Sequence, residues 1–146
     1  PEIEVEHRSA EEIQNILHGK RVLLVEDHPL DIEISRRILE HVDVKVVSAQ
    51  DGKAALEQFK GEEPYHFDAI LMDIQMPNMN GFVAARAIRK VAKPDAQIIP
   101  IIALSADDTP EDVRKCKEAG MNAHIAKPVE PQKLYQILCE YLLAPI

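Results

Sequence analysis

After residue 20, the chain alternates between short, continuously hydrophobic runs and longer stretches whose hydrophobic residues recur at helical spacing. Strands that are apolar throughout are typical of a parallel sheet covered by helices on both faces. Strands that alternate with helices imply right-handed crossovers between parallel neighbours. The pattern therefore predicts an α/β fold, with a doubly wound parallel sheet of five strands and five helices. The predicted strands are residues 21–27, 44–49, 67–73, 98–106 and 122–127, and the predicted helices are residues 29–41, 51–60, 82–92, 110–119 and 130–143.

Single residues mark several of these boundaries. Pro29 stands at a first-turn helix position, where its missing amide hydrogen is not needed. Thr109 is placed to cap the helix that follows it, and Gly120 is placed to end that helix. Because proline donates no hydrogen bond in a sheet, we expect the paired part of the fourth strand to begin near Pro100.

The first twenty residues stand outside this alternation. Ser9 and Glu12 have the spacing of a capping box, and Gly19 can end a helix, so a short helix within residues 10–18 is expected. This segment is interpreted either as a connector or as a docking or dimerising helix. A short helix with only three large aliphatic residues, Ile13, Ile16 and Leu17, buries little area. We therefore favour a connector over residues 1–20, followed by one domain over residues 21–146.

Composition and charge narrow the class of protein. The 146 residues are 46% hydrophobic and 29% charged, as in ordinary globular domains, and the net charge is −8. An acidic chain is disfavoured for nucleic-acid binding, which requires basic patches, and it favours basic partners. No run approaches the ~20 apolar residues of a membrane helix, and the acidic start lacks a signal-peptide core. Cys116 and Cys139 are interpreted as small buried hydrophobes. A cytoplasmic domain without membrane contact is expected, and no oligomeric state is favoured.

Polar side chains follow four of the predicted strands. Glu26 and Asp27 follow the first strand, Asp73 the third, Ser105 the fourth and Lys127 the fifth. Because ligands of open parallel sheets bind at the carboxyl ends of the strands, these side chains are expected to share one pocket.

This set of groups fits a carboxylate that accepts a phosphoryl group. Asp73 is the candidate nucleophile, and it needs relief from the charge of Glu26 and Asp27. A hard divalent ion with oxygen ligands, most plausibly Mg²⁺, would supply that relief. Lys127 would provide a fixed positive charge for the phosphoryl oxygens, and the hydroxyl of Ser105 would donate to them.

Four motifs in order carry a family resemblance: VLLVEDHPLD, LMDIQMPNMNG, ALSA and AKP. They resemble the receiver domain of two-component response regulators and hybrid histidine kinases. The segment DIQMP is more similar to the receivers of hybrid kinases than to DNA-binding regulators. The resemblance covers residues 21–143 and implies a flavodoxin-like sheet of strand order 2-1-3-4-5. It implies a phosphohistidine donor on a histidine kinase or a histidine phosphotransfer domain. The chain would then be a stand-alone regulator or part of a hybrid kinase. In the second case it would be a cytoplasmic domain of a membrane-bound sensor kinase.

The resemblance also assigns roles to residues. Asp73 would be the phosphoacceptor and Lys127 the family's lysine, with a cis peptide bond before Pro128. Ser105 would take the switch hydroxyl position. Three groups would bind Mg²⁺ beside Asp73 itself: Glu26, Asp27 and the main-chain carbonyl of Gln75.

Other positions are expected to tune the switch or to meet a partner. His124 stands where receivers often carry Tyr or Phe. Two hypotheses follow: the side chain rotates during switching, and protonation biases it outward. The alternative is a half-exposed histidine with no switching role. The side chains of Gln75 and Asp107 are expected to control access of water to the phosphoryl group. Three residues are expected at the rim where the donor docks: His28, Leu30 and Pro128.

Two other functions remain to be weighed. An aspartate-nucleophile phosphohydrolase uses the same groups, but it needs an acid two residues after the nucleophile, where this chain has Gln75. A phosphorylation-independent interaction module is disfavoured because the whole set of site residues is present. The five glycines do not form a dinucleotide-binding motif or a P-loop.

Overall fold

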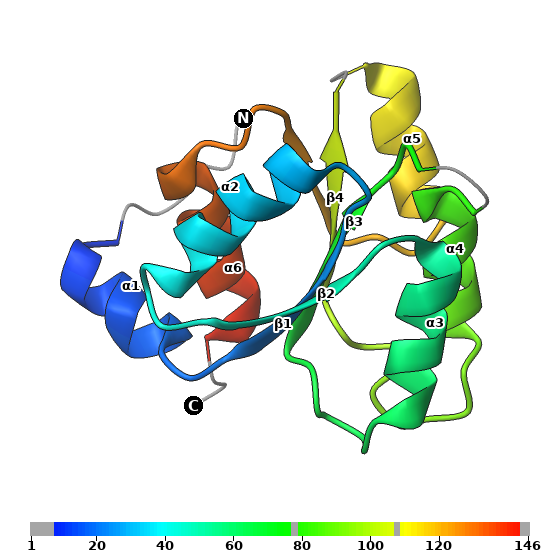
Figure 1. Cartoon of the computed structure of the whole chain (residues 1–146), viewed down its shortest axis with the longest axis horizontal. Coiled ribbons are helices and arrows are strands. Elements are labelled where there is room, and N and C mark those ends of the chain that lie inside the picture. The colour runs from blue at the N-terminus through cyan, green and yellow to red at the C-terminus, as the bar shows by residue number, and fades with distance from the viewer. Residues whose placement is uncertain (1–7, 77–78, 107–108, 144–146) are drawn as a thin grey trace.

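The sheet has five parallel strands in the order β2-β1-β3-β4-β5 (Figure 1). This computed structural model describes residues 8–76, 79–106 and 109–143. The strand order expected from the resemblance is confirmed, and all neighbouring strands pair in parallel. The main-chain oxygen of Pro100 accepts the amide of Ile70 at 2.9 Å, so the fourth strand does begin its pairing at this proline. The strands are β1 (Arg21–Val25), β2 (Lys45–Ala49), β3 (Ala69–Asp73), β4 (Ile101–Ser105) and β5 (Ala123–Ala126).

Six helices cover the sheet within the described residues: the five predicted to alternate with the strands, and the short N-terminal helix expected within residues 10–18. They are α1 (Ala10–Leu17), α2 (Pro29–Glu40), α3 (Gly52–Gly61), α4 (Gly81–Arg89), α5 (Pro110–Glu118) and α6 (Pro131–Leu142). Figure 1 shows α1, α2 and α6 on one side of the sheet and α3, α4 and α5 on the other. In the part of the chain that the structure describes, no helix has the length and apolar character needed to cross a membrane.

The two faces of the sheet form two hydrophobic cores. Side chains alternate along each strand, so Leu23 and Val25 pack under α3 and α4, while Val22 and Leu24 pack under α2 and α6. All four side chains are buried completely. Burying a side chain of this size contributes about 1.5–3 kcal/mol, and burial on both faces explains the continuous apolar runs.

Side-chain caps fix the starts of several helices. The Asp51 carboxylate accepts the amide of Ala54 at 2.8 Å, and the Thr109 hydroxyl accepts the amide of Asp112 at 3.1 Å. Gly120 ends α5 with a φ of 88°, as predicted. The helix predicted over residues 82–92 is too long, because α4 ends at Arg89. Pro94 disfavours helical backbone at the residue before it, which shortens the helix from that end.

The N-terminal helix α1 packs into the core rather than lying apart. Its predicted capping box between Ser9 and Glu12 is present. Ile13 and Leu17 are 2% and 0% exposed and belong to the core beneath α6. The Gln136 side chain also holds the main chain of Arg8, accepting its amide at 3.1 Å and donating to its oxygen at 3.3 Å. The expectation that this helix buries little is therefore wrong; the division into a connector and a domain at residue 20 stays a prediction.

Replacing Leu17 with alanine should lower the free energy of unfolding by about 2–5 kcal/mol, because it opens a cavity in a packed core. Urea denaturation followed by circular dichroism measures this. The control is Asn15→Ala, an exposed position on the same helix, which should change stability by less than about 0.5 kcal/mol. Equal stability of the two variants would show that α1 contributes nothing to the core.

Candidate functional site

The carboxyl ends of β1 and β3 bring three carboxylates together. One oxygen from each of Glu26, Asp27 and Asp73 lies within 4.8 Å of the others. Glu26 and Asp73 are 1% and 4% exposed, whereas Asp27 is exposed. They line an open groove of about 260 Å³ at this edge of the sheet. The structure therefore assembles the acidic group that the sequence predicted.

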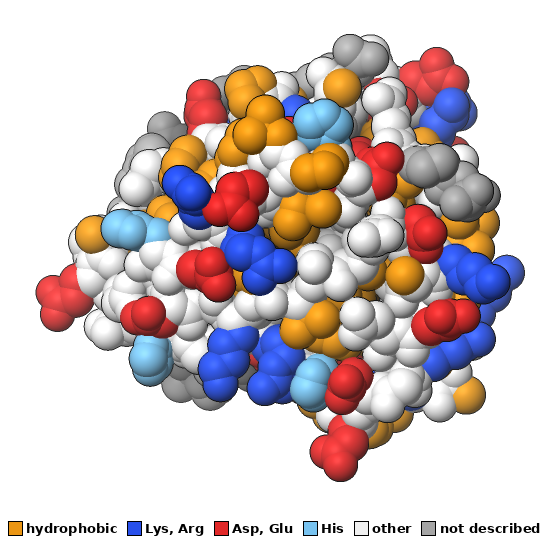
Figure 2. Space-filling model, in the orientation of Figure 1, with side chains coloured by type: hydrophobic (Ala, Val, Ile, Leu, Met, Phe, Trp, Pro, Cys, Tyr) orange, Lys and Arg blue, Asp and Glu red, His pale blue; other side chains and the backbone are white. Residues whose placement is uncertain are grey.

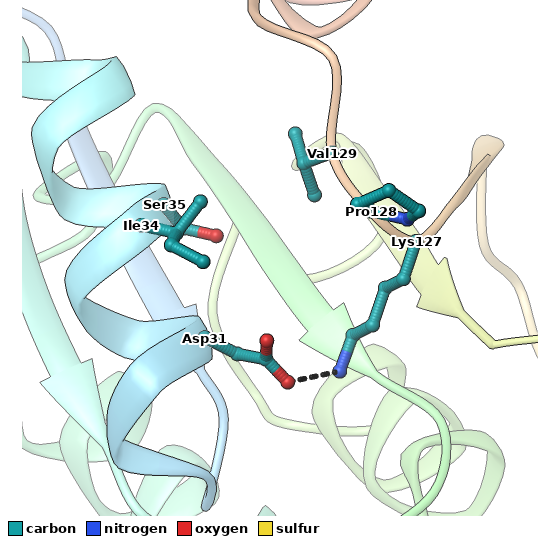
Figure 3. A pocket seen from close by; sticks show the side chains of 6 residues that line it. All are labelled: Asp31, Ile34, Ser35, Lys127, Pro128 and Val129. Carbon is teal, nitrogen blue, oxygen red and sulfur yellow. Dashed lines mark hydrogen bonds and ion pairs between the residues drawn. The ribbon is translucent and has the colours of Figure 1, made fainter.

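The ammonium group of Lys127 reaches into this group from the end of β5. Its Nζ lies 2.8 Å from Glu26 Oε2 and 3.3 Å from Asp73 Oδ2. It also donates to Asp31 Oδ2 at 3.2 Å, a contact that Figure 3 shows. Lys127 thus lies in the shared pocket, as its strand-end position predicted, and neutralises part of the charge that burial concentrates here.

Asp31 is a site residue that the sequence analysis missed. It stands in the first turn of α2 and lines the same groove as Asp73. The signal was available: α2 begins at Pro29, directly beyond the acidic pair, so its first turn must lie against the strand ends. The helix pattern alone shows Asp31 only as one of several polar positions in residues 29–41.

Main-chain groups fix the two buried carboxylates. The amide of Gln75 donates to Asp73 Oδ1 at 3.0 Å, and the amide of His28 donates to Glu26 Oε1 at 3.2 Å. Each carboxylate therefore has one oxygen held by the main chain and the other facing Lys127. This arrangement leaves the orientation of Asp73 little freedom.

Burial and neighbouring charges change the proton affinity of the site. Burial raises the pKa of Glu26 to about 7; the nearby Asp73 adds to this rise, while the hydrogen bond from Lys127 opposes it. Burial alone would lower the pKa of Lys127, but its hydrogen bond to Glu26 and the charge of Asp73 outweigh that effect and raise it. Lys127 is therefore a permanent cation, and Glu26 titrates near neutral pH when no metal is bound.

Two other predicted residues, Ser105 and His124, lie in the strands β4 and β5. Ser105 ends β4 and is completely buried, and its main-chain oxygen accepts the amide of Lys127 at 2.7 Å. His124 lies in β5 opposite Ala103, with its side chain half buried. Asp107 lies outside the described residues. The switching role of His124 and the tuning roles of Gln75 and Asp107 stay predictions, as does metal binding by the Gln75 carbonyl.

Of the three residues predicted to meet a partner, His28 lines the groove, and the partner role of all three stays a prediction. His28 is exposed, with its Nδ1 3.8 Å from Asp31 Oδ2. Leu30 is 62% exposed on α2. Pro128 follows a cis peptide bond, as expected, and lines a small pocket with Lys127 and Asp31 (Figure 3).

The composition of the site suits a hard divalent cation. Three clustered carboxylates offer only oxygen ligands, which is the preference of Mg²⁺. One fixed cation lies beside them and can meet the oxygens of a bound anion. The arrangement can thus hold a metal ion and a phosphoryl group over Asp73.

Comparison with known families decides the class of this domain. The family model for the response regulator receiver domain matches residues 22–139. The chain belongs to this family. The match begins after α1, so the N-terminal helix lies outside the part that the receiver model covers.

Histidine kinases are among the relatives. The chain is 40% identical over 121 residues to the peroxide stress-activated histidine kinase mak1 of Schizosaccharomyces pombe, covering 82% of this chain and 7% of that one. It is 30% identical over 151 residues to histidine kinase 3 of Arabidopsis thaliana, covering 91% of this chain and 14% of that one. The chain thus spans a small fraction of the length of these kinases.

Solved receivers have the same architecture. The receiver of sensor histidine kinase PA1611 from Pseudomonas aeruginosa, with magnesium in its active-site cleft, has a TM-score of 0.77 and 34% identity, covering 86% of this chain and 99% of that one. The receiver of the Arabidopsis thaliana histidine kinase CKI1, complexed with Mg²⁺ and BeF₃⁻, has a TM-score of 0.79 and 33% identity, covering 90% and 95%.

A glycine lets α4 approach the main chain of Asp73. A Cβ on Gly81 would lie 2.6 Å from the main-chain oxygen of Asp73 and 2.7 Å from the Cα of Ile74. These contacts are with main-chain atoms, which cannot rotate away. Gly81 therefore sets the distance between α4 and the end of β3.

Replacing Gly81 with alanine should destabilise this receiver by about 1–3 kcal/mol, because the added methyl overpacks the end of β3. Gly61→Ala is the matched control, since a Cβ at this helical glycine meets nothing within 4 Å. That change should leave stability unchanged or raise it by up to about 1 kcal/mol. Denaturant unfolding of both variants decides the matter, and equal effects would contradict the close approach.

Proposed function

We propose that this receiver accepts a phosphoryl group from phosphohistidine onto Asp73, in a step that requires Mg²⁺, and that this changes its affinity for partners. The observation that carries the proposal is the position of Lys127 Nζ, 3.3 Å from the Asp73 carboxylate and 2.8 Å from that of Glu26. A fixed cation at a buried, oriented carboxylate suits a nucleophile that must meet an anionic donor.

The oxygens of Glu26, Asp27 and Asp73 would hold Mg²⁺, with the Gln75 carbonyl as a further ligand. Bound there, the ion neutralises carboxylate charge and stabilises the oxygens of the transferring phosphoryl group. Solved receivers of PA1611 and CKI1 contain magnesium, which supports this assignment. Lys127 would shift from Glu26 toward the phosphoryl oxygens, and Ser105 would donate to them.

The transfer itself needs little beyond position and charge. A carboxylate oxygen of Asp73 forms a bond to phosphorus as the P–N bond of phosphohistidine breaks, and the imidazole nitrogen keeps the electron pair. Since Gln75 holds Oδ1 through its amide at 3.0 Å, the carboxylate is oriented before the donor arrives.

The donor would be a histidine kinase or a histidine phosphotransfer domain that docks on the rim. Leu30 and Ile34 of α2 are 62% and 40% exposed, beside the groove. Figure 2 shows hydrophobic side chains grouped over this part of α2, next to a histidine. The signal would leave through the surface of α5, β5 and α6. Membership of a whole hybrid kinase, and a cytoplasmic location, belong to the same proposal.

A phosphohydrolase is the weaker candidate. Its general acid would stand at Gln75, whose amide side chain carries no acidic proton at neutral pH. Repeated release of phosphate from added monoesters would favour the hydrolase; self-labelling followed by slow decay favours the receiver.

Asp73→Asn should abolish labelling by acetyl phosphate and Mg²⁺, because an amide oxygen does not attack phosphorus. The mass of the intact protein before and after incubation reports the bound phosphoryl group. Asp112→Asn, on α5, is the control and should label normally. Labelling of the Asp73 variant at another residue would reject the assignment.

The affinity for Mg²⁺ should fall as the pH drops through 7. Glu26 has a raised pKa of about 7 in the metal-free site, so below that pH the ion must displace a proton. Isothermal titration calorimetry at pH 8 and pH 6 should show a dissociation constant about tenfold larger at pH 6. Titrations at pH 6 in buffers of different ionisation enthalpy should detect the released proton. An affinity that is the same at both pH values would contradict the protonation of Glu26.

A further inference from the structure

A second groove lies at the amino ends of the strands, the end of the sheet opposite to Asp73. It has a volume of about 320 Å³ and is formed by the segments before β3 and β4 and by the end of α6. In Figure 1 the red end of α6 and the green segment between α3 and β3 both lie low in the view, below the sheet. None of the residues proposed for phosphoryl transfer lines this groove.

The walls of this groove hold most of the exposed large hydrophobic residues in the described part of the chain. Four of the seven line it: Tyr65, Ile98, Tyr141 and Leu143, which are 61%, 65%, 39% and 52% exposed. Single exposed hydrophobic residues are ordinary on a protein surface, but a group in one concave place marks a contact site. Tyr141 is also held in position, since its hydroxyl donates to the Asn122 oxygen at 2.9 Å.

The groove also contains a buried carboxylate that is incompletely satisfied. Asp95 lines it and is 2% exposed. Its Oδ2 accepts the amide of Tyr65 at 2.9 Å, whereas its Oδ1 has no hydrogen-bond partner among the described residues. A buried carboxylate oxygen without a donor is costly, so such groups usually have a partner.

The backbone at Tyr65 is strained where it meets Asp95. Tyr65 has a φ of 65°, in the left-handed region that aromatic residues rarely adopt. The hydrogen bond to Asp95 holds that conformation and keeps the tyrosine ring at the surface. Strain of this kind tends to be retained where it serves a site.

The electrostatics of the groove favour a cation. A second carboxylate, Asp68, also lines it, against the positive charge of Lys20. The carboxyl end of α6, which carries the negative end of the helix dipole, lines the groove as well, and its last turn contains no basic residue. The groove is therefore negatively charged and partly apolar.

We propose that this groove binds a segment of another polypeptide in which a lysine or arginine stands next to aliphatic side chains. The cation would lie over Asp95 and the end of α6, and the aliphatic groups would contact Tyr65, Ile98 and Tyr141. Charge complementarity selects this occupant. Residues 1–7 of the chain carry three glutamates, and residues 144–146 are uncharged, so neither segment contains the lysine or arginine that the groove would select.

The test uses two synthetic peptides that differ by one charge: acetyl-Ala-Leu-Arg-Leu-Ala-amide and the same peptide with glutamine in place of arginine. Titration into ¹⁵N-labelled protein, followed by NMR, should shift the amide signals of Tyr65, Ile98 and Tyr141. The arginine peptide should bind at least about fivefold more tightly, which corresponds to about 1 kcal/mol. No shift at these residues, or equal affinity for both peptides, overturns the proposal.

Variants separate the groove from general stickiness of the surface. Ile98→Ser should weaken binding about fivefold or more, and so should Tyr65→Asn, which removes the ring but tolerates the left-handed backbone. Val83→Ser is the matched control, because Val83 is 45% exposed on α4, away from the groove, and its loss should change nothing. Equal loss in the control overturns the assignment of the site.

Three further measurements complete the test. Asp95→Asn keeps the shape of the side chain and should remove the preference for the arginine peptide. Sedimentation equilibrium covers the other occupant: a dimer that Ile98→Ser abolishes would assign the groove to a second copy of the chain and overturn the proposal. Labelling of Tyr65→Asn by acetyl phosphate should equal that of the unmodified protein, which keeps this proposal independent of the role of Asp73.

Discussion

The ammonium group of Lys127 is the interaction on which the site depends. Glu26 and Asp73 are almost completely buried side by side, and two carboxylates in that position repel each other and lose hydration. Lys127 lies within 3.3 Å of both and contacts Asp31 as well. Because the lysine comes from the end of β5 and the carboxylates from β1 and β3, this cation links β5 to two strands with which it does not pair.

The strand order makes that arrangement possible. β1 and β3 pair near the centre of the sheet, so the residues that follow them lie side by side. The strand order reverses here, because β2 is added on one side of β1 and the later strands are added on the other. Gly81 then lets α4 pack closely against the end of β3, since a Cβ at this position would lie only 2.6 Å from the Asp73 main-chain oxygen. The position of Asp73 is thus set by packing against α4 on one side and by a main-chain hydrogen bond on the other.

Much of this could be predicted from the sequence, for physical reasons. Continuous apolar runs revealed a sheet buried on both faces, and the strand-end positions of Asp73 and Lys127 revealed the site. The contact of Asp31 was missed because it depends on how α2 leaves β1, which no local pattern records. The burial of Leu17 was missed because amphipathicity shows that a helix has an apolar face but not how deep the receiving surface is. The predicted end of α4 was too late because the apolar pattern continues to residue 92, whereas the helix ends at Arg89, ahead of Pro94.

The helix α6 joins the two ends of the molecule. It begins at Pro131, four residues after Lys127, and ends at the groove that Tyr141 lines. Along its length it is fixed to its neighbours: the Tyr135 hydroxyl donates to the Ile38 oxygen of α2, and Gln136 holds the main chain of Arg8. A helix held at several points moves as a unit, so displacement of the chain after Lys127 is opposed by contacts with α1 and α2. The packing of α1 is therefore a constraint on how far a displacement at Lys127 can move α6 toward the opposite end of the sheet.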